Sequence, residues 1–321
     1  MFKLFKKHKD LLAVVLTSFD SRRALRAYNS IKNSPKSISI DLEIVVNSLN
    51  PNYIDEVKKT FKDINVKITE TKSNGHSGFG KNSIFELFRN HEINYEYLFY
   101  IDGDDFIYPT AFEKFEQMIS MNPDIIGLQS HDFMLSENDY RASDFIKTTK
   151  QNNEFLHTIE HPYYLHSWNE LEINMCKKFP KDIFGKIHEQ YPPDRTLFLS
   201  ANILKNEKDL FFLDDMSVYD DYIFCFILFE RALNNNYSYA QFSNSFCYVY
   251  DRINDNALTK TFEDEKNDRA WIDKKAKSHL LPLAKKCKTF DFSIVPHFQL
   301  GPPKNFSMND KIEFLRKNLI I

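Results

Sequence analysis

Near the end of the first third of the chain stands the sequence Tyr97-Leu98-Phe99-Tyr100-Ile101-Asp102-Gly103-Asp104-Asp105-Phe106. Its first five residues are apolar or aromatic, which is typical of a strand that is buried on both faces. Three carboxylates and a glycine follow at its carboxyl end, where open α/β sheets bind their ligands. Carboxylate oxygens suit Mg²⁺ or Mn²⁺, which also bind phosphate oxygens. The same residues are common in ordinary turns, so this sequence alone leaves a turn and a metal site as alternatives.

Strands and helices alternate before this sequence. Predicted strands cover residues 11–16, 42–46 and 66–68, and predicted helices cover residues 22–32 and 53–62. The apolar residues of the first helix recur at helical spacing, and Asp20 and Ser21 before it are good N-caps. This alternation predicts an α/β fold with a mostly parallel central sheet and right-handed crossovers.

A glycine-rich segment precedes the carboxylates. Residues 72–82 contain Gly75, Gly78 and Gly80, although the whole chain has only 7 Gly. We expect a loop here that opens a helix over residues 82–89, so that backbone amides at the helix terminus could approach a diphosphate or a sugar. The spacing matches neither a Walker motif nor the Rossmann fingerprint, and an ordinary flexible loop is the alternative.

The composition excludes several classes of protein. With 321 residues, of which 42% are hydrophobic and 15% aromatic, the chain can bury a sizeable core. A formal charge of −3 gives no electrostatic footprint for nucleic acid as a partner. The 4 Cys are widely spaced and form no Cys-x-x-Cys motif, which argues against a zinc site or a disulfide framework. A reducing, cytoplasmic location is therefore expected.

Two segments bear on membrane contact. The apolar run at residues 11–16 is too short for a signal peptide or a membrane span. Residues 1–9 and 274–288 combine lysines with apolar side chains and could contact the cytoplasmic face of a membrane peripherally. A solvated terminus and an amphipathic helix packed on the domain are the alternatives.

The order of these motifs resembles the GT-A glycosyltransferases, and specifically the inverting family two. That family follows its first strand with Thr-x-Asn/Asp, which is similar to Thr17-Ser18-Phe19-Asp20. Its Asn-x-Gly-x-x-x-Ala-Arg-Asn segment resembles residues 74–82, with Lys81 where Arg is common. Its Asp-x-Asp-Asp strand end, with Pro a few residues later, matches residues 102–109. One departure concerns Asn47-Ser48, which stands where the family usually has paired Asp.

The resemblance implies a nucleotide-sugar donor, with a UDP-sugar favoured, and Mn²⁺ or Mg²⁺ as the cofactor. Asp104 is the first candidate metal ligand, with Asp102 on ribose or metal and Asp105 assisting. The residues expected to contact the donor are Thr17, Phe19, Asp20, Asn47, Gly75, Lys81, Asn82, Asp102, Gly103 and Arg252. Arg252 lies in a segment similar to the family's Tyr-x-Tyr-Arg ending and could close over the diphosphate, because a guanidinium suits phosphate oxygens.

An inverting transfer also needs a general base for the acceptor hydroxyl. Asp220-Asp221, followed by an apolar helical pattern to residue 233, resembles the family's Glu-Asp-x-x-Leu segment. Asp221 falls on the catalytic position and Asp220 replaces the usual Glu. Helix capping is the alternative role for this pair. Asp214 and Asp215 compete for the role of base and are expected to be loop residues.

The sequence therefore predicts a metal-dependent, inverting glycosyltransferase that moves a sugar to a hydroxyl of a glycan, glycolipid or glycoprotein. Residues 1–125 would form the nucleotide-sugar half of the domain, residues 126–260 the acceptor half, and residues 261–321 a C-terminal helical extension. Two alternatives remain open: a nucleotidyltransferase of related fold, and a sugar-binding module without turnover. The first usually has a glycine-rich loop after its first strand, which residues 17–22 lack.

Overall fold

The computed structural model describes residues 8–107, 111–119, 122–128, 130–133, 172–176, 197–215, 237–243 and 248–251, and single positions of a helical segment between 220 and 235. Its centre is an eight-stranded sheet in the order β3-β2-β1-β4-β9-β6-β10-β8. The strands are β1 (His8–Thr17), β2 (Ile40–Val46), β3 (Lys67–Glu70), β4 (Asn94–Asp102), β6 (Ile125–Leu128), β8 (Glu172–Cys176), β9 (Leu197–Ser200) and β10 (Tyr239–Ser243).

The direction of the strands confirms a mostly parallel sheet. β3, β2, β1 and β4 are parallel neighbours, and β6 is parallel to β10. β9 runs antiparallel to both β4 and β6, and β8 runs antiparallel to β10. A second sheet has the order β5 (Phe106–Ile107), β11 (Tyr248–Asp251) and β7 (Ser130–Phe133).

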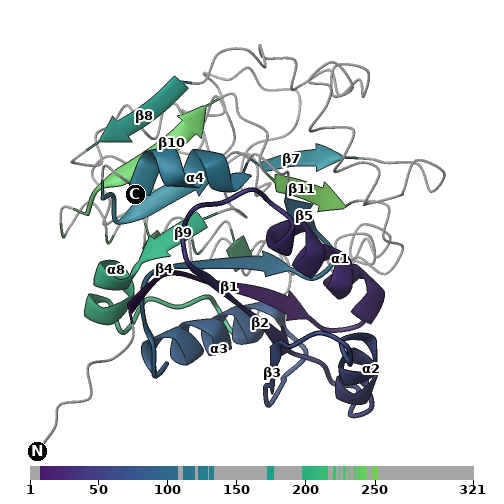
Figure 1. Cartoon of the computed structure of the whole chain (residues 1–321). Coiled ribbons are helices and arrows are strands. Elements are labelled where there is room, and N and C mark those ends of the chain that lie inside the picture. Colours follow the sequence, from purple (N-terminus) through teal and green to yellow (C-terminus); the bar gives the residue numbers. More distant parts are fainter. Residues whose placement is uncertain are drawn as a thin grey trace, which may run out of the picture.

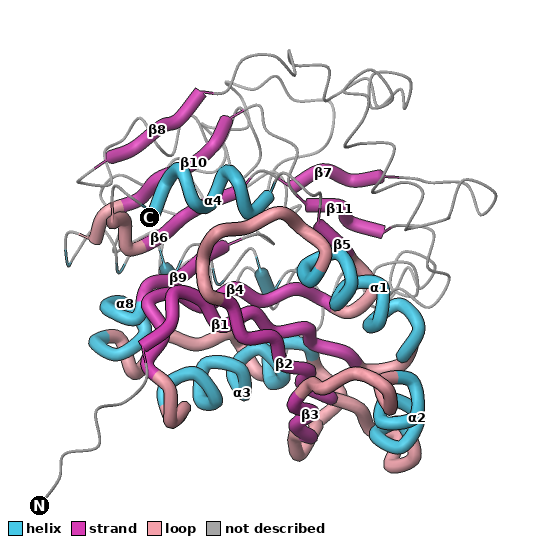
Figure 2. The backbone as a smooth tube through the Cα atoms, viewed as in Figure 1, coloured by secondary structure: helices cyan, strands magenta, loops and turns pink. Residues whose placement is uncertain are grey.

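Helices cover both faces of the central sheet. They are α1 (Ser21–Lys32), α2 (Tyr53–Thr60), α3 (Ser77–Arg89), α4 (Ala111–Ile119) and α8 (Ala201–Asn206). In Figure 1, α1 and α4 lie on one side of β1 and β4, and α3 lies on the other. Figure 2 shows the same arrangement, with the strands as a layer between the helices. The described part of the chain is thus a three-layer α/β structure.

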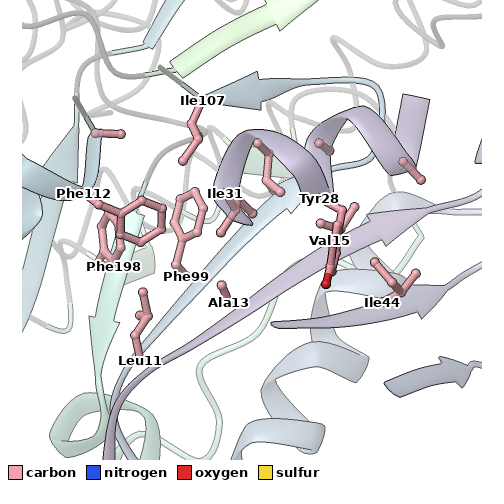
Figure 3. Packing of buried hydrophobic residues seen from close by; sticks show 14 of the residues in the cluster. Leu11, Ala13, Val15, Tyr28, Ile31, Ile44, Phe99, Ile107, Phe112 and Phe198 are labelled. Atoms are coloured by element: carbon pink, nitrogen blue, oxygen red, sulfur yellow. The ribbon is translucent and has the colours of Figure 1, made fainter. Parts of the chain in front are cut away.

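Both faces of the sheet are buried at β1 and β4, which explains why the sequences of these strands are continuously apolar. One face of the sheet packs against α1, α2 and α4, and Phe99, Phe112 and Phe198 meet there as Figure 3 shows. The other face packs against α3, where Phe85 lies 6.1 Å from Tyr100 and 5.6 Å from Phe212 between ring centroids. Both faces are covered, so neither strand alternates between apolar and polar residues.

Most predicted elements are present, with shifted ends. The helix predicted over residues 22–32 begins at Ser21, and the side chain of Asp20 caps it by accepting from the backbone of Arg22 and Arg23. The predicted start of the next helix after β3 was wrong. Residues 77–81 belong to the first turns of α3 rather than to a loop.

Other predictions lie outside the described residues. These include the helical extension over residues 261–321 and the basic segment within it. Among the residues that are described, no helix combines the length and the apolar character that crossing a bilayer requires. The predicted boundary at residue 125 falls at the first residue of β6, within the central sheet.

Candidate active site

The carboxyl ends of β1, β2 and β4 lie side by side. Leu16 pairs with Asp102 across β1 and β4, and Thr17 pairs with Val46 across β1 and β2. The chain runs from β1 to β2 and β3 on one side and then returns to β4 on the other. The carboxyl ends of β1 and β4 therefore form a topological switch point, the place where open α/β sheets bind ligands.

Gly103 closes this edge of the sheet tightly. Its backbone N–H donates to the carbonyl oxygen of Leu16 over 2.6 Å. A Cβ atom at this position would lie 2.8 Å from the same oxygen and 3.0 Å from Cβ of Thr17. The close approach of two backbones, and not an unusual backbone angle, explains the glycine between the carboxylates.

We expect Gly103→Ala to lower the free energy of unfolding by about 1–3 kcal/mol, the usual cost of overpacking. The obstacle is a backbone oxygen, which cannot rotate away as a side chain can. Thermal unfolding monitored by circular dichroism would measure the change. An unchanged melting temperature would contradict the tight contact between β1 and the turn.

The three carboxylates after β4 differ in exposure. The side chain of Asp102 is 29% exposed, and Asp104 is also partly exposed. Asp105 is 0% exposed, and its backbone N–H donates to the carbonyl of Asp102 in a turn. The buried guanidinium of Arg26 donates to the carbonyl of Asp104 and lies over the Phe106 ring. Only Asp102 and Asp104 therefore present oxygens that a ligand could reach.

Lys81 joins this turn to the distant Asp220-Asp221 pair. Its side chain is 2% exposed, and its Nζ lies 2.5 Å from Asp221 Oδ1, 2.9 Å from Asp220 Oδ2 and 3.8 Å from Asp102 Oδ2. Burial disfavours the charged ammonium, but the three carboxylates raise the pKa of Lys81 well above its usual value. Lys81 is thus a buried cation held by three anions.

The amino-terminal turns of α3 position Lys81 against Asp220. Ser77 and Lys81 are four residues apart and so lie on one face of the helix. The Ser77 hydroxyl donates to Asp220 Oδ2 over 2.9 Å, beside the bond from Lys81 to the same oxygen. Asp220 is buried. It also lies at the amino end of the α3 dipole, which stabilises an anion.

Other α3 contacts fix the segment that leads to Asp220. Asn82 exchanges two hydrogen bonds with the backbone of Phe212, of 2.7 and 2.9 Å. Just before the helix, the amide of Asn74 donates to the carbonyl of Asp214 over 2.8 Å. The side chain of Asn82, predicted to contact the donor, thus binds the backbone of the segment before Asp220.

Asn47 links the end of β2 to the segment before α3. Its side chain is buried, donates to the carbonyl of His76 over 3.0 Å and accepts from the Thr71 hydroxyl over 2.8 Å. A Cβ on Gly80 would lie 2.8 Å from Asn47 Nδ2, so this glycine allows α3 to pack closely on β2. Asn47, which was predicted to contact the donor, thus joins β2 to the residues around the start of α3 through these hydrogen bonds.

The remaining predicted donor residues surround the same edge. The Thr17 hydroxyl is buried and lies 2.5 Å from the Tyr53 hydroxyl. Phe19 is 41% exposed in the loop after β1. Asp20 caps α1, and Gly75 has φ 88°, which favours glycine. Of this set, Phe19 offers the largest exposed surface.

Some predictions cannot be placed and others were incomplete. Arg252 lies outside the described residues, whereas Asp214 and Asp215 are exposed, as expected of loop residues. The sequence interpretation missed the roles of Ser77 and Arg26. The spacing of Ser77 and Lys81 could have indicated the first, but only if the helix had been predicted to start earlier. No local signal links Arg26 to the carbonyl of Asp104.

No protein-family profile matches the sequence, and no curated protein matches it. Similarity is found in solved structures of Staphylococcus aureus TarS. The crystal structure of TarS residues 1–349 superposes with a TM-score of 0.53 at 14% identity, over 96% of this chain and 73% of that one. The same fragment in complex with UDP-GlcNAc gives a TM-score of 0.55 at 14% identity, over 96% and 74%. The chain has the GT-A glycosyltransferase fold.

The sheet order of this fold places the carboxylate turn at the switch point. In this chain β9 runs antiparallel between β4 and β6 and thereby joins the two halves of the sheet. At 14% identity, the similarity concerns the fold. The function must be argued from the site itself.

Proposed function

We propose that this GT-A protein is a metal-dependent glycosyltransferase that transfers a sugar from a nucleotide-sugar to a hydroxyl group, with inversion. One observation carries the proposal. The carboxylate turn after β4 and the Asp220-Asp221 pair, far apart in sequence, meet around Lys81 within 3.8 Å of its Nζ. A donor-binding carboxylate and a base for the acceptor would then belong to one site.

The donor half suits a divalent cation. Asp102 and Asp104 would hold Mn²⁺ or Mg²⁺, because both are partly exposed and lie on one turn at the switch point. Within the described ranges no three His, Cys, Asp or Glu side chains are grouped to hold a metal by themselves. Mg²⁺ is often bound by one or two carboxylates together with substrate phosphates. The two carboxylates of Asp102 and Asp104 are therefore enough for a site that the donor phosphates complete. The cation would offset charge on the departing diphosphate.

The choice of donor rests on a structural neighbour. TarS has been crystallised with UDP-GlcNAc, which makes a UDP-sugar the first donor to test. The acceptor is proposed to be a hydroxyl of a glycan, glycolipid or glycoprotein in the cytoplasm. Phe19, exposed beside the switch point, offers an apolar surface for the donor.

Asp221 is the proposed general base. Its side chain is 13% exposed, whereas that of Asp220 is 5% exposed, so Asp221 is the more accessible of the two. The ammonium of Lys81, 2.5 Å from Asp221 Oδ1, holds this carboxylate in place. Asp220, which binds both Ser77 and Lys81, would support Asp221 rather than react.

Nucleotide binding is the first prediction to test. We expect a nucleoside diphosphate with Mn²⁺ to raise the melting temperature, because a ligand at 100 times its dissociation constant stabilises by about 2.7 kcal/mol. UDP, GDP, ADP and CDP would be compared by thermal shift, each with Mn²⁺ and with EDTA. If no nucleotide or nucleotide-sugar changes the melting temperature, the donor site proposed above does not exist.

Product analysis separates the alternatives. A glycosyltransferase releases a nucleoside diphosphate when an acceptor is added, and a nucleotidyltransferase releases pyrophosphate from a nucleoside triphosphate and a sugar phosphate. A sugar-binding module would bind without releasing either product. Measuring nucleoside diphosphate release from the best-binding nucleotide-sugar with acceptor hydroxyls, and pyrophosphate release from nucleoside triphosphates with sugar phosphates, would therefore distinguish the three functions.

A further inference from the structure

We propose that Lys81 is a positioning residue that holds the donor and acceptor halves of the site together, by sharing one ammonium among Asp102, Asp220 and Asp221. The inference rests on the proposed function for the roles of Asp102 and Asp221. The resemblance to family two placed Lys81 among the donor-contacting residues. Its burial in the structure assigns it to the interior of the site instead.

The geometry shows how the sharing works. Lys81 Nζ lies 2.5 Å from Asp221 and 2.9 Å from Asp220, both distances of direct charge-assisted bonds. Asp102 lies further away, at 3.8 Å. The ammonium is therefore bound tightly on the base side and more loosely on the donor side. A cation bound to Asp102 could replace that looser contact without breaking the other two.

The charges of the cluster are unbalanced. Three ionised carboxylates and one ammonium sum to a charge of −2, in a region where Lys81 and Asp220 are almost completely buried. Charges interact more strongly in such surroundings than in water. A divalent cation on the donor side would balance the sum, whereas loss of the ammonium would leave three anions facing one another. Lys81 therefore keeps Asp221 beside Asp102 until metal and donor arrive.

The test begins with Mn²⁺ alone, in the full chain. Lys81→Met should lower the melting temperature by roughly 10 °C, because removing one partner of a buried ion pair is costly. Mn²⁺ without nucleotide should then recover part of this loss, since the cation can replace the missing positive charge. Lys67→Met is the matched control, because Lys67 pairs with Glu43 at 3.2 Å but is largely exposed. Mn²⁺ should raise the melting temperature of the control and of the unaltered protein by less than that of Lys81→Met, because both keep the ammonium of Lys81.

Two further variants keep the inference testable if Lys81→Met folds poorly. Lys81→Arg keeps the charge and should retain most of the stability. The double variant Lys81→Met with Asp220→Asn restores the cluster charge to −2 and should melt above Lys81→Met alone. A double variant that melts at or below the single variant would overturn the shared-ammonium arrangement, and so would an equal Mn²⁺ effect in Lys67→Met.

Kinetics distinguish positioning from donor contact. We expect Lys81→Met to lower kcat by on the order of 100-fold, with little change in KM for the nucleotide-sugar, and Lys81→Arg to restore most of the rate. A raised KM with unchanged kcat would instead make Lys81 a donor-binding residue. The Mn²⁺ measurements need no nucleotide-sugar, so they test Lys81 even if the proposed transfer is absent. If Lys81→Met transfers sugar at an unchanged rate, the positioning role of Lys81 is overturned, while the proposed transfer stands.

Discussion

Asp221→Asn is expected to reduce the rate of sugar transfer by roughly 10²–10⁴-fold, the usual contribution of a general base. The amide has nearly the same shape as the carboxylate but cannot accept the proton of the acceptor hydroxyl. Lys81 keeps Asp220 and Asp102 as partners, so the donor half should stay assembled. Binding of the nucleotide-sugar, measured by calorimetry, should therefore change little while kcat falls.

Asp214→Asn is the matched control for this experiment. Asp214 precedes Asp220 in the same segment, its side chain is exposed, and the contact from Asn74 reaches its backbone carbonyl. The substitution should leave both binding and transfer unchanged. Full activity of Asp221→Asn, or an equal loss in Asp214→Asn, would remove Asp221 from the mechanism and return the search for the base to the rest of the chain.

Asp104→Ala should abolish the part of nucleotide binding that depends on a divalent cation, and reduce transfer by roughly 10²–10³-fold. Removing the carboxylate leaves Asp102 as the remaining reachable ligand on this turn. The backbone carbonyl that accepts from Arg26 is retained, so the turn itself should keep its shape. Thermal shift with UDP, compared with and without Mn²⁺, measures the cation-dependent component directly.

Asp63→Ala controls for the loss of one surface charge, because Asp63 is exposed in the turn after α2. It should respond to UDP and Mn²⁺ as the unaltered protein does. If Asp104→Ala also keeps the full response to Mn²⁺, its carboxylate does not hold the cation. The proposal that Asp104 is a metal ligand would then be wrong.

The elements that the sequence predicted well are those whose burial leaves a local pattern. β1 and β4 are covered on both faces, so their residues are apolar without alternation, and their ends are marked by polar residues. The carboxylate turn could be recognised because it follows such a strand directly. Its position at the switch point then followed from the order of strands and helices.

The start of α3 could not be predicted from composition. Glycine lowers helix propensity, so three glycines in six positions favoured a loop. In the structure, Gly80 lies within α3, and Asn47 and Leu16 leave no space for a Cβ atom at that position. The need for glycine at position 80 comes from Asn47 and Leu16, which pack against the helix. The residues next to Gly80 in the sequence do not indicate this contact.

The partners of Lys81 were beyond sequence reasoning for a different reason. Asp220 is 139 residues away, and no spacing rule connects such positions. The sequence interpretation named both the carboxylate turn and the Asp220-Asp221 pair as candidates, and it assigned Lys81 to the donor by resemblance. Only the packing of α3 between the sheet and the segment before Asp220 shows that its ammonium faces inward.

Hydrogen bonds attach α3 to residues 204–212, and they affect which substitutions this protein can tolerate. Arg89 donates to the carbonyls of Leu204, Glu207 and Leu210, and Asn82 binds the backbone of Phe212. Four of these bonds are accepted by main-chain carbonyl oxygens, which every substitution preserves, and the fifth uses the backbone N–H of Phe212, which only proline would remove. Exposed side chains between residues 205 and 215 are thus free to diverge without loosening the attachment. The attachment of this segment to α3 can therefore persist while its exposed side chains change.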